Sequence, residues 1–112
     1  MTKQLIVTIP AGDLALRREI EQGVEAYADV RQLQNYADPA TVKLVLDIVA
    51  QGVSIAGGVA GIVTFVRSLK QAKAQQGVVV NILIEAPGGP ALPVEQADAE
   101  LLARLLSQPD GR

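Results

Sequence analysis

The sequence contains no cysteine, no histidine and no tryptophan among its 112 residues. Without cysteine it can form neither a disulfide nor a thiolate nucleophile, and without histidine it offers no Ser-His-Asp triad. Zinc sites and haem ligation through these side chains are excluded for the same reason. Carboxylates, lysines, arginines, hydroxyls and backbone groups remain for chemistry. We therefore predict that the chain is not an enzyme and holds no cofactor.

Aromatic side chains are also scarce, at 3% of the chain, which is too few for a platform on which nucleic-acid bases stack. Twelve acidic residues against ten basic ones give a net charge of −2, so no nucleic-acid partner is expected. Hydrophobic residues make up 49% and charged residues 20%, a composition typical of a packed globule. We predict one α/β domain over residues 1–107, followed by a loose C-terminal tail at 108–112.

The N-terminus has no signal-peptide pattern, since its short apolar stretch ends at Pro10. Together with the missing cysteines, this predicts a cytoplasmic protein. One stretch opens an alternative: residues 48–66 carry no charge, and as a helix they would span about 28 Å, close to a bilayer core of about 30 Å. Gly57 and Gly61 have the spacing at which membrane helices pack closely. A membrane-associated oligomer is therefore a second hypothesis, although further glycines and polar residues in the run favour a buried helix.

The first third of the chain predicts a strand, a helix and a second strand. The β-branched run at 3–9 is typical of a central strand and ends at Pro10. Asp13 is placed to cap the helix that follows, whose apolar residues recur at helical spacing on one face. Residues 30–36 are more polar, which indicates a strand nearer an edge of the sheet.

The middle of the chain predicts two helices. Asp38 and Pro39 combine a capping side chain with a preset φ, as at many helix N-termini. A single helix reaching residue 76 would be about 57 Å long, more than the diameter of about 35 Å expected for a globule of this size. The intervening glycines would break it, so helices are predicted near 39–51 and 55–76, with Gly77 as a left-handed C-cap.

The last third of the chain predicts a strand at 78–84, covered on both faces because it is almost continuously apolar. A turn at 86–90 leads to a short edge strand at 91–94 and an amphipathic helix at 97–107. The element order is then β-α-β-α-(α)-β-β-α. With right-handed crossovers, it predicts a mostly parallel four-stranded sheet with an antiparallel edge hairpin.

Candidate sites are few. Asp13, Asp38 and Glu85 follow strands in the predicted topology and could gather a divalent cation, so a small cation-dependent enzyme is a third hypothesis. The placement of both aspartates favours helix capping instead. Asp47 and Asn81 are isolated polar residues in apolar segments, where they are either catalytic or hydrogen-bonded parts of the structure.

The second predicted helix offers a candidate interaction surface. A domain of this size buries only about 65% of its unfolded-chain surface, so an apolar helix face is available for a partner protein or for a second copy of the chain. Small residues permit close approach and basic residues follow them. The candidate residues are Gly57, Gly58, Gly61, Phe65, Arg67 and Lys70.

Several of these features occur together in one known family. They are the glycine-broken apolar stretch Gln51-Gly52-Val53-Ser54-Ile55-Ala56-Gly57-Gly58, the basic helix end Phe65-Val66-Arg67-Ser68-Leu69-Lys70, a valine-rich strand, a Pro-Gly turn and a leucine-rich last helix. Over residues 3–107 the chain resembles the effector-associated constant component family of bacterial conflict systems. The resemblance implies an accessory or adaptor role beside a protease-like effector, and it carries no catalytic residue over.

Overall fold

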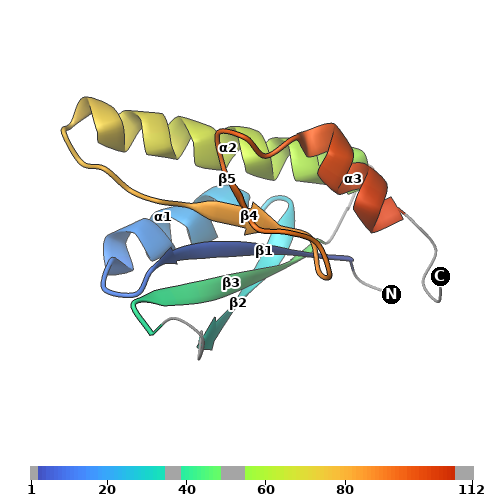
Figure 1. The fold of residues 1–112 in the computed structure, drawn as a ribbon, viewed down its shortest axis with the longest axis horizontal. Helices are drawn as coiled ribbons and strands as arrows, with labels where there is room; N and C mark the ends of the chain where they lie inside the picture. Colours follow the sequence, from blue (N-terminus) through green and yellow to red (C-terminus); the bar gives the residue numbers. More distant parts are fainter. Residues whose placement is uncertain (1–2, 35–38, 49–54, 108–112) are drawn as a thin grey trace.

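The structure, a computed structural model, describes residues 3–34, 39–48 and 55–107 (Figure 1). These residues form a five-stranded antiparallel sheet with three helices packed on one of its faces. In chain order the elements are β1 (Lys3–Pro10), α1 (Leu14–Val24), β2 (Ala28–Gln34), β3 (Thr41–Ile48), α2 (Ile55–Gln75), β4 (Leu83–Glu85), β5 (Leu92–Pro93) and α3 (Ala99–Ser107).

The sheet has the strand order β2-β3-β1-β4-β5, so the first strand of the chain lies at its centre. β1 pairs with β3 along its whole length, from Lys3 opposite Ile48 to Pro10 opposite Thr41. Alternate residues of both strands point at the helices and are buried, as period-two side-chain geometry requires. The buried core residues of these two strands are Leu5, Val7, Ile9, Leu44, Leu46 and Ile48.

The predicted mostly parallel four-stranded sheet is wrong, because the segment predicted as a helix at 39–51 contains strand β3. β3 pairs antiparallel with β2 and with β1, and the six residues between β2 and β3 are too few for a helical crossover. Val45 faces away from the helices yet is only 2% exposed. Apolar residues on both faces of a central strand obscure the alternation and imitate helical spacing.

Two predicted helix termini are confirmed. Asp13 caps α1, since its Oδ1 accepts a hydrogen bond of 3.0 Å from the backbone N–H of Leu16. Gly77 has a φ of 81° and ends α2 in a Schellman motif. There the N–H of Val78 donates to the Lys73 carbonyl at 2.9 Å, and the N–H of Gly77 donates to the Ala74 carbonyl at 3.0 Å.

Other boundaries differ from the prediction. The strand predicted at 78–84 is paired only from Leu83 onward, and Val79 in its first half is 89% exposed. The hairpin after it is confirmed, with β5 at the opposite edge of the sheet from β2. Asp38, predicted as an N-cap, lies outside the described residues, as does the predicted tail at 108–112.

α1 and α2 cross at two reciprocal contacts between a glycine and an aromatic ring. A Cβ placed on Gly23 of α1 would lie 1.9 Å from Cζ of Phe65 on α2. A Cβ placed on Gly61 of α2 would lie 2.6 Å from Cζ of Tyr27, in the turn after α1. At each contact the tip of a ring approaches a helical glycine more closely than a residue with a side chain would permit.

Most of the uncharged run at 48–66 falls in α2, which buries Val59, Ile62, Val63 and Val66 in the core. In the part of the chain that the structure describes, no helix combines the length and the apolar character needed to cross a membrane.

Candidate interaction surface

The face of the sheet turned away from the helices carries no described helix, and we call it the open face. Residues directly opposite each other on paired strands share a face, so the register defines its members. On β1 and β3 they are Gln4, Ile6, Thr8, Lys43, Val45 and Asp47; on β2 and β4 they are Asp29, Arg31, Leu33, Leu83 and Glu85. The open face therefore mixes aliphatic and charged side chains.

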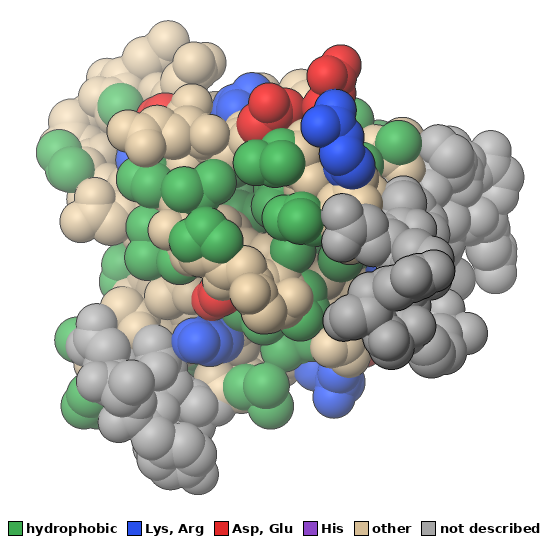
Figure 2. Space-filling view, turned by 45° about the vertical axis from the view of Figure 1, so that its right-hand side comes forward, with side chains coloured by type: hydrophobic (Ala, Val, Ile, Leu, Met, Phe, Trp, Pro, Cys, Tyr) green, Lys and Arg blue, Asp and Glu red, His purple; other side chains and the backbone are tan. Residues whose placement is uncertain are grey.

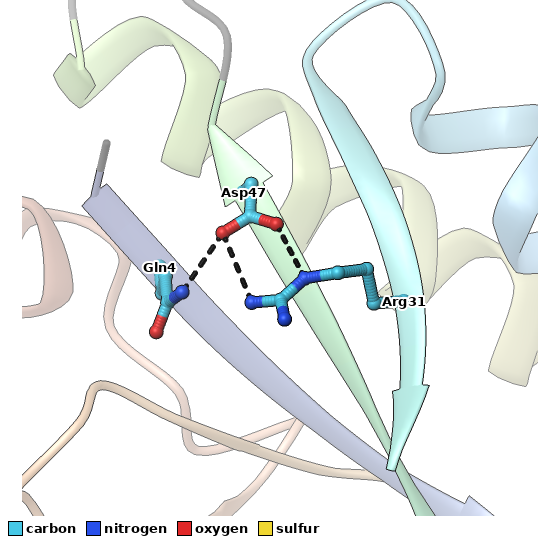
Figure 3. A network of polar contacts seen from close by, with 3 residues as sticks. All are labelled: Gln4, Arg31 and Asp47. Atoms are coloured by element: carbon cyan, nitrogen blue, oxygen red, sulfur yellow. Dashed lines mark hydrogen bonds and ion pairs between the residues drawn. The ribbon is translucent and has the colours of Figure 1, made fainter. Parts of the chain in front are cut away.

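A polar network occupies one end of the open face (Figure 3). The Asp47 carboxylate on β3 accepts hydrogen bonds from Gln4 on β1 and Arg31 on β2. Gln4 Nε2 lies 2.9 Å from Asp47 Oδ1, Arg31 Nε 2.8 Å from Oδ2 and Arg31 Nη2 3.4 Å from Oδ1. Both oxygens are thus engaged, and the network fixes the relative position of three adjacent strands.

These hydrogen bonds change the acidity of Asp47. The hydrogen bond from Arg31, followed by that from Gln4, lowers the pKa of the Asp47 carboxyl below its ordinary value of 3.8, against the opposing effect of partial burial. The Asp47 side chain is 17% exposed and that of Arg31 is 55% exposed, so solvent screens the pair. Its role is to hold the strands in register more than to stabilise the fold.

The lowered pKa predicts the sign of a pH effect. A carboxyl with a depressed folded pKa stabilises the fold above its unfolded pKa, and this stabilisation is lost as the pH falls through the folded pKa. We expect Asp47→Asn to lower the free energy of unfolding at pH 7 by about 0.5–1 kcal/mol. We also expect it to flatten the loss of stability between about pH 5 and about pH 2.

Urea unfolding of both proteins across this range measures the effect. Glu25→Gln provides the control, because Glu25 is an exposed carboxylate in the turn after α1. A wild-type acid slope that survives Asp47→Asn unchanged would contradict the role given to this network.

The middle of the open face is aliphatic, with a charge pair beside it. Val45 stands between Ile6 and Arg31, the residues opposite it on the flanking strands. Lys43 Nζ lies 3.7 Å from Glu85 Oε1, across β1 from β3 to β4. Figure 2 shows hydrophobic side chains gathered across the middle of one side of the molecule, with charged ones scattered among and around them. An apolar centre with a polar margin is the usual anatomy of a protein–protein contact.

Gly58, Gly61 and Phe65, proposed from the sequence as part of an interaction surface, pack against the chain's own residues. Gly58 is buried, and a Cβ on it would lie 3.3 Å from Ile48 Cγ2. Gly61 and Phe65 belong to the crossing with α1. Gly57 is exposed, one turn before Gly61. Gly58 and Gly61 therefore serve packing within the domain.

The basic residues of α2 also have partners within the chain. Arg67 donates from Nε to the Val94 carbonyl at 2.9 Å and from Nη2 to the Ala97 carbonyl. Lys70 forms an ion pair with Glu95. Lys73 Nζ, also on α2, lies 3.7 Å from Glu19 Oε2 on α1. A cavity of about 380 Å³ beside Arg67 and Lys70 is thus bordered by cations that already have partners.

The residues proposed as cation ligands are not brought together. Asp13 caps α1, Glu85 pairs with Lys43, and Asp38 lies outside the described residues. Among the residues that the structure describes, no three carboxylates, histidines or cysteines are grouped so that they could hold a metal ion. Asn81 is exposed near β4.

Sequence reasoning identified Asp47 as unusual but missed its partners. Gln4 and Arg31 lie in segments predicted as strands, and period-two alternation puts them on the polar side of each. Their meeting with Asp47 could not be found while 39–51 was interpreted as a helix. Comparison with protein-family models, with curated proteins and with solved structures finds no match for this chain.

Proposed function

We propose that the chain is a non-enzymatic, cytoplasmic adaptor that binds a partner protein through the open face of its sheet. The observation that carries this proposal is the placement of all three described helices on the other face. An antiparallel sheet can leave one face to solvent, where strongly polar side chains are the rule. Here that face keeps the exposed Leu33 and the half-buried Ile6 and Leu83 beside its charges, packed around the buried Val45.

The rigidity of this face supports the proposal. The Asp47 network and the Lys43–Glu85 ion pair hold side chains from four strands in fixed positions. Side chains that are ordered before binding lose less conformational entropy on association, so a partner gains affinity from them. The polar groups at the margin would fix the orientation of that partner, while Ile6, Leu83 and Leu33 would supply apolar contact area.

The resemblance to the effector-associated constant component family suggests the class of partner. We propose a protease-like effector, trypsin-like or caspase-like, from the same bacterial conflict system. The adaptor would recruit or restrain that effector and would contribute no catalytic group to it.

The test compares a variant of the open face of the sheet with a variant of the helical layer. The double variant Ile6→Gln, Leu83→Gln makes the open face more polar. The control is Leu14→Gln, which replaces a leucine of α1 that is 64% exposed. Purified protease-like effector from the same host is titrated calorimetrically with each protein. We expect the double variant to bind at least about tenfold more weakly and Leu14→Gln to bind like the wild type. No binding to the effector, or equal weakening by both variants, would refute this site.

A further inference from the structure

Strand β2 forms one edge of the sheet. In the described part of the chain it pairs only with β3, so its other side presents unpaired backbone N–H and C=O groups. It runs for seven residues, and Asp29, Arg31, Gln32 and Leu33 on it are exposed. Leu33 is a large aliphatic residue with 48% of its surface exposed. Such an edge is suited to pair with another strand.

The charges on β2 are unbalanced within one copy of the chain. Asp29 lies directly opposite Asp47, an arrangement of like charges that is unfavourable across a strand pair. Arg31 neutralises Asp47 through Nε and Nη2, and Asp29 makes no ion pair with any described residue. The N–H groups of Arg31 Nη1 are not used in that contact and remain as donors.

We propose that two copies of this chain pair through their β2 strands, antiparallel and centred on Val30, to form one continuous ten-stranded sheet. In this register Asp29 lies opposite Arg31 of the partner subunit, and the symmetry repeats the contact. Each unpaired carboxylate then gains a guanidinium about 5 Å away between Cβ atoms, within reach of an ion pair. The pairing lies at the edge of the sheet, so the adaptor's open face stays accessible.

Among the antiparallel registers in which two β2 strands could pair, only the one centred on Val30 places opposite charges across from each other. Centring the pair on Asp29 or on Arg31 would place identical charges opposite each other, which is destabilising. Centring it on Gln32 would place Arg31 opposite Leu33 of the partner subunit and leave Asp29 without a cation. Charge complementarity therefore selects both the occupant and the register.

Charge reversal at Asp29 tests the proposal without removing a contact from the single subunit. In Asp29→Arg the new guanidinium lies opposite Asp47 in its own chain, so the fold is retained, but it meets Arg31 of the partner subunit. We expect sedimentation equilibrium to show a concentration-dependent dimer for the wild type. The dissociation constant should rise at least about tenfold in Asp29→Arg.

The double variant Asp29→Arg, Arg31→Asp exchanges the two charges, places a cation opposite Asp47 in the same chain and restores opposite charges across the dimer. It should recover a dissociation constant close to that of the wild type. A wild type that stays monomeric at about millimolar concentration, or a dimer that Asp29→Arg leaves unchanged, would overturn the inference. Effector titration of a monomeric Asp29→Arg protein is a separate measurement, so failure of the dimer and failure of the adaptor function are distinguished.

Discussion

Replacing Gly23 and Gly61 together by alanine is expected to lower the free energy of unfolding by about 3 kcal/mol, the sum of two overpacked contacts. Each added Cβ would overlap an aromatic ring, at 1.9 Å for Phe65 and 2.6 Å for Tyr27. The rings must turn outward or the helices must separate, and either change exposes apolar surface. Each single substitution should cost about 1–2 kcal/mol, because the higher helix propensity of alanine offsets part of the strain.

Urea unfolding followed by circular dichroism measures this loss. Gly12→Ala is the matched control, since nothing lies within 4 Å of a Cβ at that position, and it should change stability by no more than about 0.5 kcal/mol. Adding Phe65→Leu to Gly23→Ala should recover part of the loss, because the smaller side chain makes room for the methyl group. Equal stabilities of Gly23→Ala and Gly12→Ala would show that the two helices do not cross here.

Arg67→Met is expected to lower the free energy of unfolding by about 2 kcal/mol, since hydrogen bonds from a charged donor contribute more than neutral ones. The guanidinium on α2 serves the carbonyls of Val94 and Ala97, which lie in the connection from β5 to α3. Methionine keeps much of the apolar stem but donates nothing. The Val94 and Ala97 carbonyls then lose their hydrogen bonds from the guanidinium, and the segment that leads into α3 is no longer hydrogen-bonded to α2.

Arg67→Lys separates charge from geometry. A single ammonium cannot reproduce the planar fork that serves two carbonyls, so we expect a loss of about 1 kcal/mol, between those of the wild type and Arg67→Met. Hydrogen exchange should show faster exchange at the amides of α3 in Arg67→Met, while those of β1 and β3 change less. Uniform acceleration across the sheet and α3 would contradict a local tie.

The sequence predicted local structure well wherever a single residue type determines it. Asp13 begins a helix because a short side-chain acceptor is needed there, and Gly77 ends one because a left-handed φ is needed there. The sequence predicts both positions. β1 was identified as a central strand because its β-branched residues leave little alternative. Boundaries that depend on a neighbouring strand, such as the start of β4, were not predicted.

The topology was missed at one segment. Val42, Val45 and Leu46 have the spacing of a helix face, and Asp38 with Pro39 resembles a helix start. What decides the outcome is non-local: β1 and β2 together offer hydrogen bonds along the whole of β3, and burial of Leu44 and Leu46 follows. Once β3 is a strand, its connection from β2 is too short for a parallel crossover, and the antiparallel sheet follows.

The central position of β1 has a consequence for synthesis on the ribosome. Of the five described strands, β1 is synthesised first. It must wait for β3, more than thirty residues later, and for β4, nearly eighty residues later, before both its edges are paired. Until α2 and β4 have been synthesised, the sheet of the nascent chain is incomplete, and its apolar face is not yet covered by α2. Translation pauses or chaperones acting over the last third of the chain would therefore influence the yield of folded protein more than those acting earlier.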